Sequence, residues 1–377
     1  MDVRSCSCLG LVGLGCSILV AVAADAPVRG TARLLPGSGI EISWDSIPGR
    51  DYLVEATPAL TAPWQVDPFG PGVLRATGET LVATVGATGQ RQFFRIVALP
   101  SEPPNPAPDE LVWIPPGTFM MGTPGDETAR EDYEGPQTRV TLTRGYWLGK
   151  YEVTIDQYRE FLLAGGDPGG VAWTAANCPI KQDETFSLSG TLSGRRGDLP
   201  MCRINWAGAV VYCDWRTEVA RQEGTLPEGY VFALPTEAQW EHACRAGTTT
   251  RYSFGDTPDC DPISCGVCAA LADYCWFCGN SGQKSQPVGL KQPNPWGLYD
   301  MHGNVWEWTN DWWDWTLPGG ALVDPLGPEG GTFRTRHGGS WATFPKQCRS
   351  GHRYGGTPVA SLESLGMRLA LVPIRER

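Results

Sequence analysis

A run rich in glycine and tryptophan near the C-terminus, from Asn294 to Trp308, limits the folds that this chain can adopt. Its residues read NPWGLYDMHGNVWEW, and the motif Gly338-Gly-Ser-Trp341 follows it. Glycines allow tight turns and tryptophans favour burial, and neither helical nor strand periodicity persists through such a run. We therefore expect long structured loops with little regular secondary structure in this part of the chain.

The same run places two carboxylates, Asp300 and Glu307, around a glycine turn that tryptophans flank. Carboxylate oxygens at this spacing can hold a cation or shape a pocket. The alternative is a capped turn in which Glu307 forms a buried ion pair. One thiol, Cys348, follows the second motif.

Composition restricts the partners. The chain has 377 residues, 41% of them hydrophobic, which is enough for two or three domains with a large core. Its formal net charge is −11, whereas nucleic acids and anionic membranes require a positive protein surface. We therefore expect no nucleic-acid partner. The four histidines show no metal-binding spacing, so a self-contained iron or zinc active site is not expected.

The N-terminus, residues 1–23, has the features of a signal peptide. An apolar stretch follows Arg4, and Ala21-Val22-Ala23 has the small residues that signal peptidase prefers. The mature protein is predicted to be exported to the periplasm, the cell surface or the medium. A lipid anchor on Cys16 is the alternative. No later stretch is long and apolar enough to span a bilayer, so no transmembrane segment is expected after cleavage.

A small β-sandwich is predicted for residues 24–99. Its apolar residues alternate with period two in short runs, which turn residues separate. The runs are Ile40–Trp44, Tyr52–Ala56, Thr80–Thr84 and Gln92–Val97. The module resembles the fibronectin-type modules of exported bacterial proteins, which implies a spacer or adhesion role. Residues 100–109 form a proline-rich linker.

Residues 110–377 form one larger unit in which three helix starts can be recognised. Thr154 with Gln157 and Thr236 with Gln239 are capping boxes that precede apolar residues at helical spacing. Asn205 is the predicted cap of a third helix.

Five cysteines cluster at positions 260, 265, 268, 275 and 278. Two of their pairs have the spacing of zinc knuckles, but few residues separate the pairs. Disulfides are the preferred interpretation because the chain is predicted to be exported. Ten cysteines remain after signal cleavage, so a free Cys348 requires a second unpaired thiol, for which Cys213 and Cys244 are candidates.

Several segments of the larger unit resemble one known family. They are Ile114–Gly122, Tyr151–Thr154, Leu234–Glu241, Gly297–Trp308, Gly338–Trp341 and Gly366–Arg368. In this order they resemble the formylglycine-generating enzyme, or sulfatase-modifying factor, family. The resemblance implies an α+β domain of C-type-lectin-like architecture, often stabilised by calcium. The same fold also carries scaffold and other non-catalytic relatives.

The resemblance also indicates where the catalytic centre lies. The family's named enzyme oxidises a protein cysteine to formylglycine with molecular oxygen, and two thiolates hold its copper ion. These thiolates follow the serine of the Gly-Gly-Ser motif by three and eight residues. Here the two positions hold Thr343 and Cys348, so one ligand is replaced by a hydroxyl that binds Cu(I) poorly. Cys348, Ser340 and Trp306 are the residues that correspond to the site.

Two readings of Cys348 stay open. It is a Cu(I) ligand if another cysteine completes the site, and otherwise it is a buried structural thiol or half of a disulfide.

The resemblance implies two structural calcium sites. The first takes the side chains of Asp300 and Glu307 with the carbonyls of Gly303 and Val305. The second takes Asp273, the Tyr274 carbonyl, Asn280 and the Gly282 carbonyl. All are hard oxygen donors, which calcium prefers.

Two functions follow from the sequence. The first is oxidation of a cysteine in a protein or peptide substrate, as in sulfatase maturation. The second is non-catalytic binding, in which the lectin-like cleft holds a peptide, a glycan or an envelope partner.

Overall fold

The computed structural model describes residues 30–35, 39–46, 51–57, 65–66, 73–75, 80–86, 93–98, 110–166, 179–181, 197–256, 261–266 and 268–374. The predicted signal peptide, with its cleavage site, and the predicted linker lie outside these residues. Within them, no helix is long and apolar enough to cross a membrane.

The N-terminal module consists of two antiparallel sheets, as its alternating runs predict. Strands of one sheet pair in the order β1-β2-β6, and β3 pairs with β4, β5 and β7 in the other. Their bounds are β1 (Gly30–Leu35), β2 (Gly39–Asp45), β3 (Asp51–Thr57), β4 (Gln65–Val66), β5 (Leu74–Arg75), β6 (Thr80–Gly86) and β7 (Phe93–Ala98). One apolar cluster contains Ile42 and Trp44 from the first sheet and Tyr52 and Phe94 from the second. The predicted β-sandwich is confirmed.

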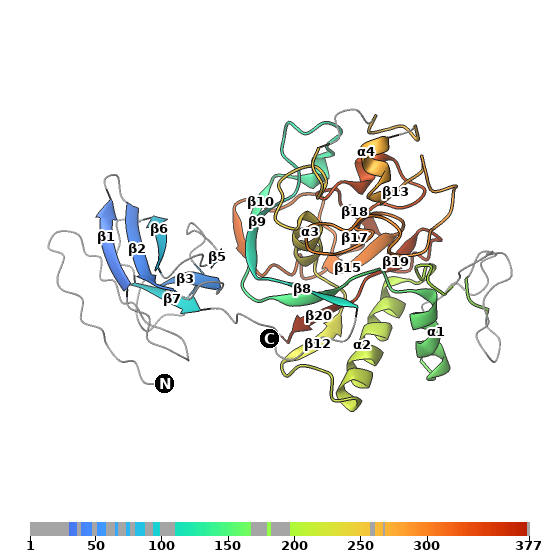
Figure 1. The fold of residues 1–377 in the computed structure, drawn as a ribbon, viewed down its shortest axis with the longest axis horizontal. Coiled ribbons are helices and arrows are strands. Elements are labelled where there is room, and N and C mark those ends of the chain that lie inside the picture. The colour runs from blue at the N-terminus through green and yellow to red at the C-terminus, as the bar shows by residue number, and fades with distance from the viewer. Residues whose placement is uncertain are drawn as a thin grey trace.

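The larger unit is built from several small sheets (Figure 1). One has the order β12-β20-β11-β8, another β18-β17-β15-β19, a third β16-β10-β9, and β13 pairs with β14. The strands are β8 (Leu111–Ile114), β9 (Gly117–Met121), β10 (Thr138–Leu142), β11 (Tyr146–Gly149), β12 (Tyr230–Ala233), β13 (Cys275–Trp276), β14 (His302–Gly303), β15 (Trp306–Trp312), β16 (Ala321–Val323), β17 (Arg334–His337), β18 (Tyr354–Gly356), β19 (Leu365–Met367) and β20 (Ala370–Pro373).

Among the described residues, the helices have nine residues or fewer, except α2, which has 17. They are η1 (Asp132–Glu134), α1 (Ile155–Leu163), α2 (Trp206–Gln222), α3 (Glu237–Arg245), α4 (Ala269–Ala272) and η2 (Pro345–Cys348). Both predicted capping boxes are present, at Thr154 and at Thr236, and the Asn205 side chain caps α2 through the Gly208 amide. Helix α2 lies beside α1 and β12 (Figure 1).

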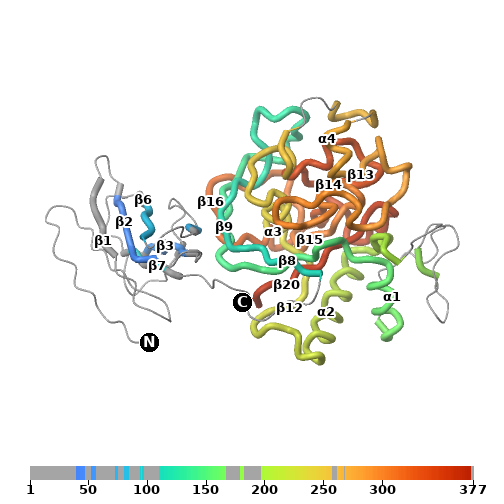
Figure 2. Tube along the Cα trace, viewed as in Figure 1, coloured from blue at the N-terminus to red at the C-terminus, as the bar shows by residue number. Residues whose placement is uncertain are grey.

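Loops connect most of these elements, particularly between α3 and the C-terminus, as the tube in Figure 2 shows. Two apolar clusters form the main core of this unit, and a third, smaller one contains Tyr252, Leu271, Cys275, Phe277 and Cys348. This sheet-rich α+β domain with little regular structure agrees with the predicted fold class. One residue of the glycine-rich run, His302, contacts both Cys275 and Cys348 of the third cluster.

Candidate functional site

Cys348 is the last residue of η2, and its side chain is fully buried in the third apolar cluster. It is a free thiol, whose Sγ lies 3.8 Å from the Phe344 carbonyl oxygen and 3.7 Å from Thr343 Oγ1. The interpretation of Cys348 as half of a disulfide is therefore wrong. Its sulfur lies against the turn formed by residues 340–344.

Thr343 stands at the first of the two positions that the family resemblance assigns to copper-binding thiolates. Its hydroxyl accepts a hydrogen bond from the Ser340 amide at 2.8 Å and donates one to the Ser340 carbonyl at 2.9 Å. The Thr343 oxygen therefore closes a local turn. The Ser340 side chain is buried, and its Oγ accepts from the Ala342 amide at 3.3 Å.

A second free thiol lies beside Cys348. The fully buried Cys275 side chain, from β13, is hydrogen-bonded to that of Cys348. Burial, followed by this hydrogen bond, raises the pKa of Cys275 well above its ordinary value. Cys275 was predicted to form a disulfide with another cysteine of the group at positions 260–278, and this prediction is wrong. No spacing rule connects Cys275 with Cys348, because only the tertiary fold brings their segments together.

His302 holds both thiol-bearing segments in place. Residue 302 pairs with Cys275 in the β13–β14 ladder, and its ring Nδ1 donates to the Cys348 carbonyl at 2.8 Å. The Ser253 amide donates to Nε2 at 3.2 Å, so the ring is the neutral Nδ1–H tautomer. Burial lowers the His302 pKa to about 4, which keeps the ring neutral at pH 7.

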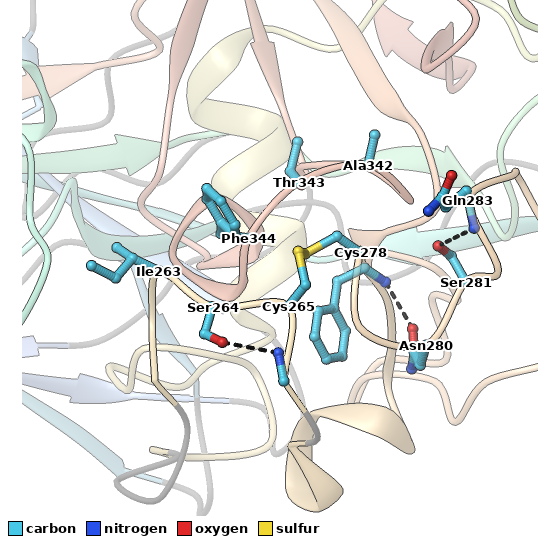
Figure 3. Close-up of a disulfide and its surroundings, with 12 residues drawn as sticks. Ile263, Ser264, Cys265, Cys278, Asn280, Ser281, Gln283, Ala342, Thr343 and Phe344 are labelled. Atoms are coloured by element: carbon cyan, nitrogen blue, oxygen red, sulfur yellow. Dashed lines mark hydrogen bonds between the residues drawn. A yellow bond between two sulfur atoms is a disulfide. The ribbon is translucent and has the colours of Figure 1, made fainter.

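A disulfide joins Cys265 and Cys278 beside this site (Figure 3). Cys268 is also disulfide-bonded. The predicted disulfides of the five-cysteine group are thus confirmed for Cys265, Cys268 and Cys278. The zinc alternative for this group is wrong because Cys265 and Cys278 are cross-linked. The Cys278 amide donates to the Thr343 carbonyl at 3.0 Å, which ties the disulfide loop to the turn above Cys348. Cys213 and Cys244 are free thiols, as proposed from the sequence.

Glu307 lies in a buried ion pair. The Arg368 guanidinium donates to both of its carboxylate oxygens, at 2.7 Å to Oε1 and 3.0 Å to Oε2, and the Trp240 indole donates to Oε2 at 2.6 Å. This is the alternative that the sequence left open for Glu307. A calcium ion at this carboxylate has to compete with Arg368.

Asp300, unlike Glu307, has one carboxylate oxygen without a hydrogen-bond partner. Its Oδ2 accepts from the Gly289 amide at 2.7 Å, whereas Oδ1 is buried without a hydrogen-bond partner. Burial raises the pKa of Asp300 to about 6, although the Gly289 hydrogen bond opposes this rise. The backbones of Gly303 and Val305 lie nearby in sequence, and the Val305 amide donates to Glu152 at 3.2 Å. Of the first predicted calcium site, Asp300 Oδ1 is therefore free to bind an ion, whereas both Glu307 oxygens are engaged by Arg368.

Glu152 is a buried acid that the sequence reasoning missed. It accepts from the Asn304 side chain at 2.7 Å, and burial, followed by the charges of Asp300 and Glu307, raises its pKa well above the ordinary value. Its place after a strand in the motif Tyr151-Glu-Val-Thr154 was the available signal.

At the second predicted calcium site, the Asn280 side chain is already engaged. Its Oδ1 accepts from the Phe277 amide at 3.0 Å and its Nδ2 donates to the Cys275 carbonyl at 2.8 Å. The Asp273 carbonyl accepts from the Gln292 amide, the Tyr274 ring stacks on Phe254 at 4.1 Å, and Gly282 has a positive φ of 64°. Asn280 therefore closes the turn after Cys275.

Trp306 belongs to the first core cluster, not to the cluster of Cys348. Its ring lies 5.7 Å from that of His352 and under the Arg336 guanidinium, 5.0 Å away. Trp306 therefore packs in a different core cluster from Cys348, and its assignment to the site stays a prediction.

A cavity of about 590 Å³ lies elsewhere, at the start of α1, where Glu110, Tyr151, Asp156 and Arg216 are among its lining residues. Within the described part of the chain, no three histidine, cysteine or acidic side chains are grouped so that they could hold a metal ion. The two free thiols of Cys275 and Cys348 could therefore provide two ligands to a metal ion, but not three.

Comparisons with known proteins agree with these features. Residues 97–372 match the family model described as the Sulfatase-modifying factor enzyme 1-like domain. The formylglycine-generating enzyme of Bos taurus is 28% identical over 395 residues, which cover 92% of this chain and 97% of that protein. That of Thermomonospora curvata is 30% identical over 313 residues, which cover 73% of this chain and 98% of that protein.

Two solved structures share the fold. PvdO from Pseudomonas aeruginosa is 26% identical with a TM-score of 0.55, over 69% of this chain and 93% of PvdO. Treponema denticola variable protein 1 is 26% identical with a TM-score of 0.53, over 70% of this chain and 95% of that one.

Proposed function

Because the chain belongs to the sulfatase-modifying factor enzyme 1-like family, we propose that it oxidises a cysteine side chain of a protein or peptide substrate at a centre formed by Cys348 and Cys275. The observation that carries the proposal is the contact between two reduced, buried thiols. Position 343, where the family has a ligand thiol, holds threonine in this chain. In the proposed centre, Cys275 from β13 supplies the second thiol instead.

The reaction balances with dioxygen and an added thiol reductant. The substrate carbon that bears sulfur loses two electrons, and hydrolysis replaces sulfur with oxygen and releases hydrogen sulfide. Dioxygen accepts these two electrons and two more from the reductant, and it becomes two molecules of water, one of which the hydrolysis consumes. A Cu(I) ion bound by Cys348 and Cys275 would supply the one-electron chemistry with dioxygen that side chains lack.

The residues around the thiols have supporting roles in this proposal. His302 fixes the Cys348 backbone, and Thr343 and Ser340 shape the turn over the sulfur. Both sulfurs are fully buried, so a substrate cysteine reaches them only when this turn moves. Trp306 and Arg336 lie outside the thiol cluster, where they stabilise the fold. The proposed site of action is outside the cytoplasm, in line with the apolar N-terminal stretch.

The test uses the full mature protein. We expect that protein loaded with Cu(I), dioxygen, a thiol reductant and a C-x-P-x-R peptide gives the mass loss of formylglycine formation. Cys348→Ala should lower the rate about 10,000-fold or more, as loss of an essential catalytic group does. Cys213→Ala removes a free thiol from the first core cluster, away from the cluster of Cys348, and should keep the wild-type rate.

The burial of both sulfurs favours the second function, non-catalytic binding, as the alternative. If folded wild-type protein that has bound copper leaves the peptide unchanged, the oxidase proposal is wrong and the binding function takes its place.

A further inference from the structure

We infer that Cys275 and Cys348 form a two-thiolate site for a single Cu(I) ion, in which Cys275 takes the place of the thiol that position 343 lacks. This inference rests on the proposed function for the identity of the metal. The assignment of the ligands rests on the geometry of this chain.

Two strands and one ring determine the spacing of the thiols. Cys275 pairs with His302 across the parallel β13–β14 ladder. The His302 ring then reaches the Cys348 carbonyl at 2.8 Å, so one residue is fixed to both cysteines. Both thiols pack in the third apolar cluster, where their side chains are hydrogen-bonded. A pair of donors held in this way is preorganised for one small ion.

Two glycines make room for the sulfurs. A Cβ atom on Gly303 would lie 2.7 Å from Cys275 Sγ, and one on Gly339 would lie 2.7 Å from Cys348 Sγ. Both glycines have positive φ, 95° and 74°, which other residues rarely adopt. Each sulfur therefore lies directly against main chain. The close packing excludes water and bulky ligands, which favours a low coordination number.

The donor set selects a soft monovalent ion. Thiolates bind Cu(I) more readily than hard cations, and the apolar side chains of Tyr252, Leu271 and Phe277 surround the pair. Two thiolates and Cu(I) carry one net negative charge. The Lys291 ammonium favours negative charge at Cys275, while Asp300 opposes it. Lys291 itself lies 3.6 Å over the Trp276 ring, next to Cys275 in β13.

The first experiment measures Cu(I) binding without turnover. Reduced full-length mature protein is titrated with Cu(I) against a chromogenic Cu(I) chelator under anaerobic conditions. We expect one tightly bound ion per chain. Cys275→Ala and Cys348→Ala should each weaken binding by at least about 100-fold, the upper range for loss of an outer-shell partner. Cys213→Ala is the matched control and should bind as wild type does.

The second experiment adds a rescue. Thr343 Oγ1 lies 3.7 Å from Cys348 Sγ, so Thr343→Cys places a thiol close to Cys348 from the other side. In the Cys275→Ala background, T343C should restore one tight Cu(I). X-ray absorption of the copper-loaded wild type should show two sulfur neighbours and no nitrogen. This readout does not depend on whether any alanine variant folds.

Three results would overturn the inference: wild-type protein that binds no Cu(I), a folded Cys275→Ala variant with wild-type affinity, or a copper spectrum without two sulfurs. The proposed function fails separately. Tight copper binding without peptide oxidation refutes the oxidase and leaves the site, whereas peptide oxidation that survives in Cys275→Ala refutes the site and leaves the oxidase.

Discussion

At the scale of single residues, several buried charges in this domain pair with partners that lie far away in sequence. Glu237, at the first turn of α3, accepts from Arg353 at 2.5 Å and 2.9 Å and lies 3.1 Å from His337 Nε2. Burial alone would raise the pKa of Glu237, but the Arg353 charge and the His337 hydrogen bond together lower it to about 2. The ionised carboxylate is therefore stabilised in the folded state.

The lowered pKa of Glu237 predicts how the free energy of unfolding depends on pH. Because the folded pKa of Glu237 lies below its unfolded value of about 4.3, its contribution is complete above pH 4.3 and is lost as the pH falls towards 2. Between pH 5 and pH 3 we expect wild-type protein to lose about 1.5 kcal/mol more unfolding free energy than Glu237→Gln. Urea denaturation at several pH values measures this. Glu363→Gln, at a partly exposed pair with Arg203, should not change the slope, and parallel curves for wild type and Glu237→Gln would contradict the assignment.

At the scale of elements, local signals start two of the helices, whereas a cross-link positions the loop beside the thiol site. Helices α1 and α3 start at capping boxes, so local sequence fixes where they begin. The loop between Cys265 and Cys278 contains no such signal, and its disulfide and the hydrogen bond to Thr343 position it against the turn at residues 340–344 (Figure 3). The disulfide loop therefore lies against the turn whose Thr343 hydroxyl is 3.7 Å from Cys348 Sγ.

Removal of this cross-link should open the site. We expect the double variant Cys265→Ala, Cys278→Ala to lose about 3 kcal/mol of stability, as for a closed loop of this length. Alkylation of Cys348, followed by peptide mass mapping, should become faster in the same variant. Thr154→Ala, which loses about 1 kcal/mol at a helix cap, is the control for general destabilisation and should not speed alkylation. Equal alkylation rates in wild type and the double variant would show that the loop does not cover the thiol.

At the scale of the whole molecule, buried polar contacts connect parts of the fold that regular elements do not. Glu307 in β15 joins Arg368, which follows β19, to Trp240 in α3. Glu152 joins the segment after β11 to Asn304. Asp300, with its one unpartnered oxygen, lies next to this network and remains the position where calcium is predicted.

Calcium removal tests this prediction. If calcium binds at Asp300, a chelator should lower the melting temperature by about 5 °C or more, since a ligand at 100 times its dissociation constant contributes about 2.7 kcal/mol. Asp300→Asn should remove the response to chelator while the protein stays folded, because the amide oxygen can still accept from Gly289. Asp273→Asn tests the second predicted site in the same way. An unchanged melting temperature in wild type would refute both calcium sites.

The sequence by itself determined the β-sandwich, the larger α+β domain and the starts of its main helices. These features depend on local patterns, because alternation, capping residues and turn glycines act over a few residues. The resemblance to a known family pointed to Cys348 and Thr343, and the glycine turn between Asp300 and Glu307 pointed to the acid pair. Only the tertiary structure decided that Cys275 is free and lies beside Cys348, that Glu307 pairs with Arg368, and that Trp306 belongs to a different core cluster from Cys348. These contacts join distant segments through loops that follow no period, and their geometry is set by packing of the whole domain.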